Sequence, residues 1–307
     1  MKALFVVNPV AGKGKGLEII KNFESVIQSK MPYTIELTRA KGEATDIVRR
    51  YTTKEDYIVF AVGGDGTVNE VLNGMVGSGS SLAIIPTGSG NDFVRSIYGR
   101  YTIEELLLDL LEGNNQKIDI IQVGERYFLN IASVGLDAEV VYNATQYKKL
   151  KFIKSSMAYV ISLFKTLLGS RGTYAKVTID GKVTCDEEIL LLAVANGSFY
   201  GGGIPMVPTA KVNDALADVC LVRELRIRKI MKVLPSVFKG KHIEAKEVEI
   251  YRAQEIEIEA KNGCKVNIDG EIMNASRVKM RIIPEGIEVR MPSKVTISNY
   301  CSEDKIS

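Results

Sequence analysis

Ile58-Val59-Phe60-Ala61-Val62-Gly63-Gly64-Asp65-Gly66-Thr67-Val68-Asn69-Glu70-Val71-Leu72-Asn73-Gly74-Met75-Val76 is the stretch that decides the fold of this chain. It opens with a short apolar run, rich in β-branched residues and closed by two glycines, which indicates a buried strand. Beyond the glycines, apolar residues recur at the spacing of one helix face. Thr67 followed by Glu70 matches a capping box, which predicts that the helix begins at Thr67. The stretch therefore predicts a strand that enters a helix through a glycine-rich corner.

This corner has the chemistry of an anion site. Free backbone N–H groups and the positive end of a helix favour an anion, and glycines let phosphate oxygens approach the backbone. Asp65 would repel a phosphate unless a cation or a transferable hydroxyl lay between them, which points to Mg²⁺-nucleotide chemistry. The alternative is a glycine-rich turn whose aspartate accepts local backbone N–H groups. Local chemistry leaves both open.

The motif also resembles the signature of a known family. Gly63-Gly64-Asp65-Gly66-Thr67 followed by Asn69-Glu70 is similar to the signature of the diacylglycerol kinase catalytic-domain family, which includes bacterial lipid kinases and the related sphingosine and ceramide kinases. NAD kinases share the Gly-Gly-Asp-Gly-Thr core. A second turn, Pro86-Thr87-Gly88-Ser89-Gly90-Asn91-Asp92-Phe93, resembles the Pro-x-Gly-(Ser/Thr)-x-Asn-Asp motif of lipid kinases and argues against NAD kinase. Asn91 or Asp92 is expected to cap the helix that follows.

The composition of the whole chain limits the classes of function. A length of 307 residues suggests about two domains, and 46% hydrophobic with 25% charged residues is ordinary for a soluble globular protein. A net charge of +3 is too small to indicate nucleic acid, and a single histidine argues against a Ser-His-Asp triad or a multi-histidine metal site. The four cysteines have no paired metal-ligand spacing, which predicts reduced thiols in a cytosol. We find no signal-peptide pattern, and the apolar run 157–168 is too short to span a bilayer.

Three loops of the first half are candidates for nucleotide binding. Two glycine-rich strand-to-helix turns predict a parallel sheet whose loops gather at its carboxyl edge, where a nucleotide would lie. The third loop, 8–16, lacks the ending of a Walker A motif. It is either a flexible surface segment or, as its Asn-Pro-x-x-Gly opening resembles, the first nucleotide-binding loop of the lipid kinases. The resemblance implies nucleotide-binding roles for Asn8, Pro9, Gly12, Lys13, Thr38, Gly63, Gly64, Asp65, Gly66, Thr67, Asn69, Gly88 and Ser89.

The pattern of apolar and polar residues changes near residue 125. Short alternating or apolar runs follow, several of them separated by turn pairs: Asp180-Gly181, Asn262-Gly263, Asp269-Gly270 and Glu285-Gly286. This spacing predicts a mostly antiparallel sandwich or barrel. We therefore expect an α/β nucleotide-binding domain with a parallel sheet over residues 1–125 and a mostly antiparallel β-sandwich domain for the lipid substrate over 126–291. Residues 292–307 are expected to pack back on the first domain, as they do in the family.

The second half contains a candidate general base. Val266-Asn267-Ile268-Asp269-Gly270-Glu271 ends a strand at an Asp-Gly turn, and such a glutamate is by itself typical of a solvated hairpin residue. The resemblance implies instead that Glu271 is the general base for the lipid hydroxyl and that Asp65 organises Mg²⁺ and its waters. It also implies that Asp92 and Asp119 extend this carboxylate network. The alternatives for these two residues are a helix cap and a strand-end turn.

A candidate metal loop precedes that turn. The segment 208–218 resembles the metal-bearing loop of the family, in which an Asp-Gly pair is usual. Ala215 replaces that glycine here, so a positive φ angle at this position would strain the backbone. The resemblance implies an Mg²⁺ held by the Asp214 carboxylate and the backbone carbonyls of Lys211 and Leu216, hard oxygen ligands that suit this ion. Without the resemblance the segment is a polar turn.

Two basic stretches bear on membrane binding. Lysines at 148, 149, 151 and 154 precede the apolar run 157–168, and residues 223–246 hold eight lysines and arginines against two glutamates around an expected helix at 229–238. Against an anionic leaflet each nearby basic residue contributes about 1 kcal/mol, so such clusters favour reversible binding to a membrane surface. The alternative is a pair of ordinary amphipathic helices with solvated basic faces. We expect a cytoplasmic protein that associates reversibly with the membrane surface.

The motifs from Asn8 to Glu271 occur in the order found in lipid kinases. The resemblance implies an ATP-dependent kinase, with ATP and Mg²⁺ as cofactors, that phosphorylates the primary hydroxyl of diacylglycerol to give phosphatidic acid. The alternatives are a kinase for a sphingoid base, another glycerolipid or a polyprenol, and a noncatalytic lipid-binding or regulatory protein of the same fold. Intact Asp65 and Glu271 argue against the noncatalytic alternative, whereas Ala215 leaves room for it. No nucleic-acid partner is expected, and a homodimer is left open.

Overall fold

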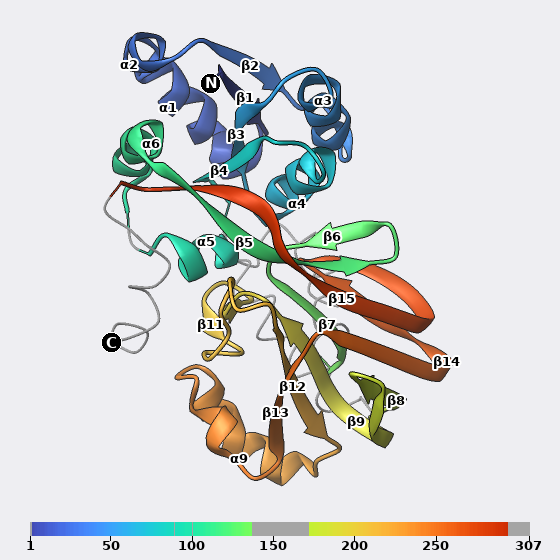
Figure 1. The fold of residues 1–307 in the computed structure, drawn as a ribbon. Coiled ribbons are helices and arrows are strands. Elements are labelled where there is room, and N and C mark those ends of the chain that lie inside the picture. The colour runs from blue at the N-terminus through green and yellow to red at the C-terminus, as the bar shows by residue number, and fades with distance from the viewer. Residues whose placement is uncertain (1, 89, 100, 137–171, 294–307) are drawn as a thin grey trace.

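The protein is described by a computed structural model, in which residues 2–88, 90–99, 101–136 and 172–293 are placed (Figure 1). Ser89, the basic and apolar stretches at 148–168, and the C-terminal segment from residue 294 lie outside the described residues. The expectations that concern those segments therefore stay predictions.

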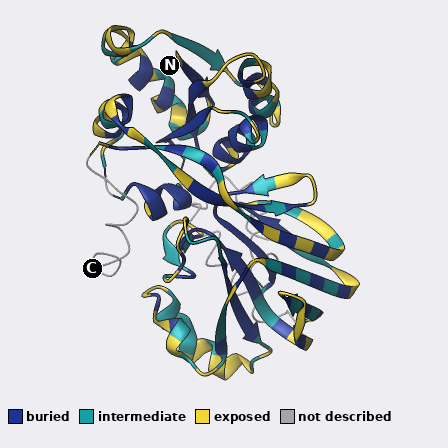
Figure 2. Ribbon diagram, viewed as in Figure 1, coloured by how far each residue is buried: buried dark blue, intermediate teal, exposed yellow. Residues whose placement is uncertain are grey.

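Four parallel strands form the centre of the N-terminal half. β3 (Tyr57–Gly63) lies between β1 (Lys2–Val7) and β4 (Ser81–Pro86), and β2 (Tyr33–Leu37) pairs with the other edge of β1. Helices lie on both sides of this sheet, so every residue of β3 is buried (Figures 1 and 2). The register places the carboxyl ends of β1, β3 and β4 side by side, which gathers the loops that follow them.

The helical elements of this half are short. They are η1 (Ala11–Gly14), α1 (Lys15–Asn22), α2 (Glu24–Lys30), α3 (Glu43–Thr52), α4 (Asp65–Met75), α5 (Asp92–Ile97) and α6 (Ile103–Glu112). α1 and α2 are separate helices because the chain leaves helical geometry at Phe23.

Two capping predictions are wrong. α4 begins at Asp65 rather than Thr67, and its N-cap, Gly64, has no side chain with which to cap. The Thr67 hydroxyl instead accepts a hydrogen bond from the Asn8 amide at 3.3 Å, while Glu70 accepts the Gly42 N–H of another helix. At α5, the N-cap residue Asn91 makes no side-chain cap bond. At α4, contacts with other loops take the side chains that local capping would use, whereas the Asn91 amide donates to the Gly88 carbonyl of its own turn at 2.9 Å.

The C-terminal half is a mostly antiparallel sheet that folds over itself. Two long strands, β9 (Lys182–Ala195) and β14 (Glu255–Ile268), each pair at one end with β7 (Ile131–Gly135) and at the other with β8 (Thr173–Ile179). This closed set of pairings encloses a hydrophobic core that contains Val134, Val177, Leu192, Ile258 and Val266. The predicted Asn262-Gly263 turn is wrong, because β14 runs through it with an irregularity in its pairing.

The remaining described elements of this half are further strands, one α-helix and one 3₁₀-helix. They are β5 (Asn114–Val123), β6 (Arg126–Phe128), the small hairpin β10 (Phe199–Tyr200) and β11 (Ile204–Pro205), β12 (Ala217–Arg223), α9 (Ile227–Val237), η2 (Lys241–Glu244), β13 (Val248–Ala253) and β15 (Glu271–Met291).

One strand joins the two halves. β15 begins at the Asp269-Gly270 turn against β14, continues along β5, and ends in parallel pairing with β4 of the first sheet. Its last residues, including Val289 and Met291, are buried in the N-terminal core. Glu285-Gly286, predicted as a turn, is an irregularity within this single strand.

Asp119 of β5 holds that irregularity in place. One carboxylate oxygen accepts the Glu285 N–H at 2.9 Å, and the other accepts the Ala215 N–H at 2.7 Å. Burial raises the pKa of Asp119, although these two N–H groups oppose the rise. Asp119 thus ties the crossing point of β15 to the loop that contains Asp214.

Candidate active site

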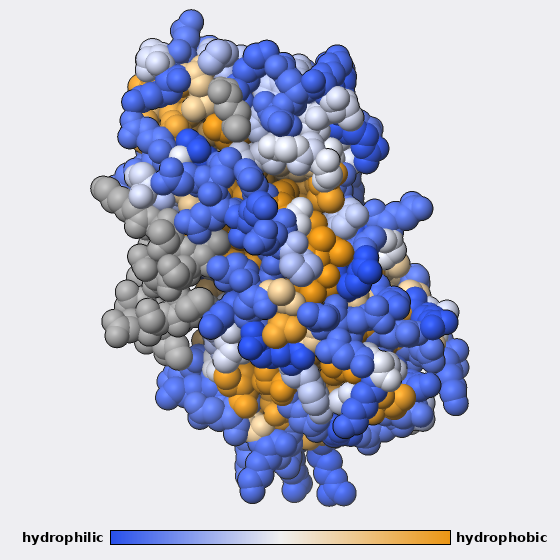
Figure 3. All heavy atoms as spheres, in the orientation of Figure 1, coloured by the Kyte–Doolittle hydropathy of each residue, from blue (hydrophilic) through white to orange (hydrophobic). Residues whose placement is uncertain are grey.

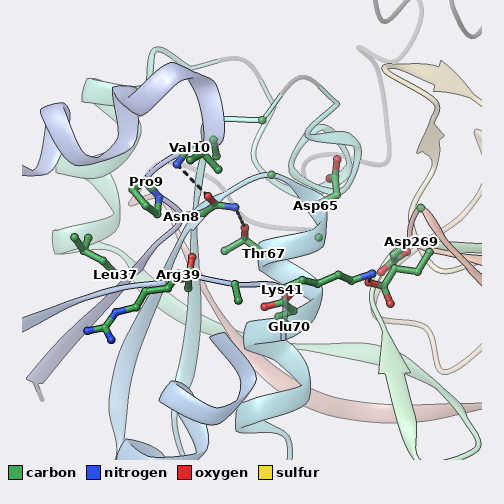
Figure 4. Close-up of a pocket in the computed structure, with 18 of the residues that line it drawn as sticks. Asn8, Pro9, Val10, Leu37, Arg39, Lys41, Asp65, Thr67, Glu70 and Asp269 are labelled. Atoms are coloured by element: carbon green, nitrogen blue, oxygen red, sulfur yellow. Dashed lines mark hydrogen bonds and ion pairs between the residues drawn. The ribbon is translucent and has the colours of Figure 1, made fainter. Parts of the chain in front are cut away.

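A deep cleft opens at the carboxyl edge of the parallel sheet, where it meets the start of β15 (Figure 4). Its volume is about 1150 Å³. All three predicted loops and the Asp269-Gly270-Glu271 turn contribute to its wall. Of the predicted site residues, it is lined by Asn8, Pro9, Thr38, Gly64, Asp65, Gly66, Thr67, Gly88 and Glu271.

The loops approach each other so closely that glycine is required. A Cβ atom added at Gly88 would lie 2.5 Å from the Gly64 Cα, and one at Gly12 would lie 2.3 Å from the Thr87 carbonyl oxygen. Gly12 also has a positive φ of 57°, which glycine adopts without strain. The glycines therefore set how tightly the three loops pack around the cleft.

Two carboxylates stand together at the end of this loop cluster. Asp65 accepts the backbone N–H groups of Asn91 and Asp92 at 3.0 and 3.1 Å, and Asp92 accepts the Gly202 N–H from the other half at 2.9 Å. Burial raises the pKa of both carboxyls against the effect of these N–H groups, and the charge of Asp65 raises that of Asp92 further. Two close, buried carboxylates are the hard oxygen donors that Mg²⁺ takes.

Asp269 anchors the turn that leads to Glu271. Its carboxylate accepts the N–H groups of Leu129 and Ile131 at 3.2 and 3.0 Å and the side-chain amide of Asn69 at 3.2 Å. Asn69 of α4 thereby connects the nucleotide half to the β7 end of the sheet. Asn69 does not line the described part of the cleft, so its nucleotide-binding role stays a prediction.

Glu271 lies between two cations. Its carboxylate contacts the Lys41 ammonium at 2.5 Å through one oxygen and the Arg126 guanidinium at 2.6 Å through the other. Burial alone would raise the pKa of Glu271, but the hydrogen bonds and charges of Lys41 and Arg126 together hold it below its usual range. The carboxylate is therefore ionised and able to accept a proton at neutral pH.

Other predicted residues lie outside the described cleft wall. These are Gly12, Lys13, Gly63, Asp92 and Asp119. Sequence reasoning missed several wall residues, namely Val10, Ala11, Ile35, Glu36, Leu37, Arg39, Ala40, Lys41, Glu70, Gly90, Asp269 and Gly270. Asp269 and Gly270 could have been found from their place beside Glu271, whereas nothing in the motif pattern marks Lys41.

The predicted metal loop has the backbone conformation that makes alanine unfavourable. Ala215 has a φ of 60°, in the left-handed region. The Asp214 carboxylate accepts the Leu216 N–H at 3.3 Å and is ion-paired with Arg252. Among the described residues, no three histidine, cysteine or acidic side chains cluster as a metal site. An Mg²⁺ at Asp214 would have to displace Arg252.

A second, apolar cavity of about 110 Å³ lies between α9 and the sheet. Leu190, Met206, Ile230, Leu234 and Phe238 are among its lining residues. His242 also lines it, and burial lowers the pKa of this histidine, which keeps the ring neutral. The cavity is therefore an uncharged space.

α9 and the residue that follows it expose apolar side chains, which is unusual for a helix that faces water. Ile227 and Met231 of α9 are 41% and 45% exposed, and Phe238, which also lines the cavity, is 53% exposed. Figure 3 shows apolar surface in this region and hydrophilic side chains projecting beyond it. No helix among the described residues is long and apolar enough to cross a membrane.

The turn at Asp269 makes stability depend on pH. Burial raises the pKa of Asp269 to about 6, against its backbone and Asn69 hydrogen bonds. A carboxyl whose folded pKa is raised stabilises the fold fully below its unfolded pKa of about 3.9, and that contribution is lost as the pH rises through the folded value. Relative to Asp269→Asn, the wild type should lose roughly 1–3 kcal/mol of unfolding free energy between about pH 4.5 and 7.5. Urea unfolding at both pH values measures this, and a constant difference between the two proteins would contradict it.

Comparison with known proteins supports the resemblance seen in the sequence. Residues 2–123 match the model of the diacylglycerol kinase catalytic domain, and residues 130–291 match that of the YegS C-terminal NAD kinase beta sandwich-like domain. The diacylglycerol kinase of Bacillus subtilis is 28% identical, covering 88% of this chain and 89% of the relative, and that of Staphylococcus carnosus is 27% identical over 99% of both. A crystal structure of a Bacillus anthracis protein, provisionally assigned as a diacylglycerol kinase, superposes with a TM-score of 0.77 at 27% identity and 94% coverage of both chains.

Proposed function

The chain belongs to the diacylglycerol kinase catalytic-domain family, and we propose that it transfers the γ-phosphoryl group of ATP to the primary hydroxyl of diacylglycerol, giving phosphatidic acid and ADP. The observation that carries this proposal is the meeting of Asp65 and Glu271 in one cleft. The two residues come from different halves of the protein. A phosphate site and a carboxylate that can act as a base thus face the same space.

In the proposed reaction, Glu271 accepts the proton of the lipid hydroxyl as its oxygen attacks the γ-phosphorus. The bond from that phosphorus to the oxygen it shares with the β-phosphate breaks, and ADP leaves with the electron pair. The N–H groups of the glycine loops would hold the phosphates, since glycines allow phosphate oxygens close to the backbone. Val10, Ile35 and Leu37 also line the cleft and supply an apolar wall for the adenine ring of ATP.

Mg²⁺ fits the carboxylates of this site to different degrees. Asp65 and Asp92 are two close, buried carboxylates, which suits a hard divalent ion. They would hold Mg²⁺ near the phosphates, where it neutralises negative charge. Asp214 with the carbonyls of Lys211 and Leu216 is also an oxygen set, but it fits less well because Arg252 already pairs with the carboxylate. Asp119 would act there through the Ala215 N–H rather than in the cleft.

The apolar cavity under α9 supports a lipid acceptor. It is lined by aliphatic side chains and a neutral histidine, as an acyl chain requires. The exposed apolar residues of α9 and its neighbouring cations, among them Arg228, Lys229 and Lys232, favour contact with an anionic membrane surface. We accordingly propose reversible membrane association through this helix.

Phosphate transfer from labelled ATP tests the function. Diacylglycerol, sphingosine and undecaprenol are presented separately in mixed micelles with Mg²⁺. We expect labelled product from diacylglycerol at a rate well above that from the other two lipids. Faster labelling of sphingosine or undecaprenol would show that this lipid, and not diacylglycerol, is the preferred substrate. If no lipid is labelled, the proposed kinase activity is overturned.

A variant of the apolar cavity tests, in the same assay, whether the acyl chain binds there. Leu234→Asp introduces a charge into the lining of the apolar cavity, which disfavours an acyl chain there. The KM for long-chain diacylglycerol should rise by about tenfold or more, with the KM for ATP unchanged. Ser236→Asp is the control, since it puts the same charge on α9 at a residue that neither lines the cavity nor belongs to the cations proposed to contact the membrane.

A further inference from the structure

An ion pair crosses the candidate active site between residues that come from opposite sides of it. Lys41 follows β2 in the nucleotide half, and Glu271 is the first residue of β15. Their charged atoms are 2.5 Å apart, and Figure 4 shows the Lys41 side chain extended along the cleft toward Asp269. The lysine therefore lies across the space between the phosphate loops and the proposed base.

Hydrogen bonds hold the backbone on both sides of Lys41, whereas its side chain is mostly exposed. Glu43 accepts the Arg39 and Ala40 N–H groups, and Glu70 accepts the Gly42 N–H at 2.8 Å. The Lys41 side chain is 76% exposed, against 23% for Glu271. Ion pairs this exposed contribute little to stability, so the ammonium can change partners at small cost.

We propose that Lys41 binds the terminal phosphate of ATP and leaves Glu271 when it does so. A terminal phosphate offers three acceptor oxygens and more negative charge than one carboxylate, so it competes well for the ammonium. Arg126 stays on the second oxygen of Glu271, at 2.6 Å, and keeps the carboxylate oriented. With one of its two cations removed, Glu271 becomes the stronger base at the moment the phosphate is in place.

This inference rests on the proposed kinase function for the role of Glu271, but its test does not need turnover. Calorimetric titration of the full chain with ATP and with ADP, each with Mg²⁺, compares two ligands that differ in the terminal phosphate. For Lys41→Met, which keeps the length of the side chain and removes the charge, the affinity for ATP should fall by about tenfold, as expected for a lost charge-assisted hydrogen bond. The affinity for ADP should change much less.

Two further variants serve as controls. Lys41→Arg keeps the charge and should recover most of the ATP affinity. Arg49→Met removes the same charge from α3, at an exposed residue that does not line the cleft. It should leave the ratio of ATP to ADP affinity as in the wild type. Thermal unfolding of each variant checks that it is folded.

The outcomes separate the two proposals. If Lys41→Met keeps the wild-type ratio of ATP to ADP affinity, or if the wild type binds neither nucleotide, the role of Lys41 is overturned. If the ratio falls as expected while the wild type phosphorylates no lipid, Lys41 is a phosphate-binding residue and the kinase function fails. In an active enzyme, Lys41→Met should also raise the KM for ATP and leave that for the lipid unchanged.

Discussion

Replacing Glu271 by glutamine is expected to reduce lipid phosphorylation by about 10²–10⁴-fold, the contribution typical of a general base. Glutamine has nearly the shape of glutamate but cannot accept the hydroxyl proton. It also loses the charge that pairs with Lys41 and Arg126, both of which can remain solvated because their side chains are 76% and 50% exposed. The measurement is kcat for diacylglycerol at saturating ATP, together with the affinity for ATP by calorimetry.

Binding of ATP should survive this substitution, because the role we propose for Glu271 is toward the acceptor hydroxyl and loss of its charge leaves Lys41 available to the terminal phosphate. Glu257→Gln is a suitable control, since Glu257 is ion-paired with Arg277 on the same β14–β15 hairpin and lies outside the described cleft wall. It should turn over diacylglycerol as the wild type does. A Glu271→Gln enzyme within a factor of about ten of wild-type kcat would show that another group takes the proton.

Replacing Asp65 by asparagine should lower kcat by about 10²–10³-fold, the loss that follows removal of one charge-stabilising group. Asparagine can still accept one of the two N–H groups of Asn91 and Asp92, so the loop should keep its shape. The negative charge that we propose for holding Mg²⁺ is lost. The concentration of Mg²⁺ needed for half-maximal rate should rise, which a titration of the ion measures.

Although Asp65→Asn should lower kcat, it should not lower the thermal stability of the protein. Burial raises the pKa of Asp65, so its charge is unfavourable in the folded protein, and asparagine should leave the thermal midpoint unchanged or raise it. Asp46→Asn is a control at an acidic residue of α3 that does not line the cleft. Unfolding of Asp65→Asn at a much lower temperature would mean that Asp65 is mainly structural.

The loops of the site were predictable because their motifs stand where strands end. β1, β3 and β4 each enter a glycine-rich segment, and parallel pairing alone brings such segments together. What lies opposite them was not predictable from spacing. Glu271 lies in the same cleft as Asp65 because β15 starts at a hairpin that Asp269 ties to Asn69 of α4. The sequence resemblance implied that Glu271 is the general base, but it did not indicate that Lys41 and Arg126 pair with its carboxylate.

The errors share a physical cause. Thr67 and Glu70 match a capping box, yet Asn8 and the start of α3 take their side chains. Glu285-Gly286 has turn chemistry, yet pairing with β5 continues on both sides of it and makes one strand. In each case a contact distant in sequence overrides the local preference.

β15 also determines how the protein can move. At the irregularity near its end, Asp119 holds Glu285, and Gly286 packs so closely on Ile120 that an added Cβ would lie 2.5 Å from that side chain. Such a continuous strand restrains how far the two halves can move apart. We therefore expect substrates to enter and leave by displacements of loops and side chains at the rim of the cleft, while the distance between the phosphate loops and Glu271 changes little.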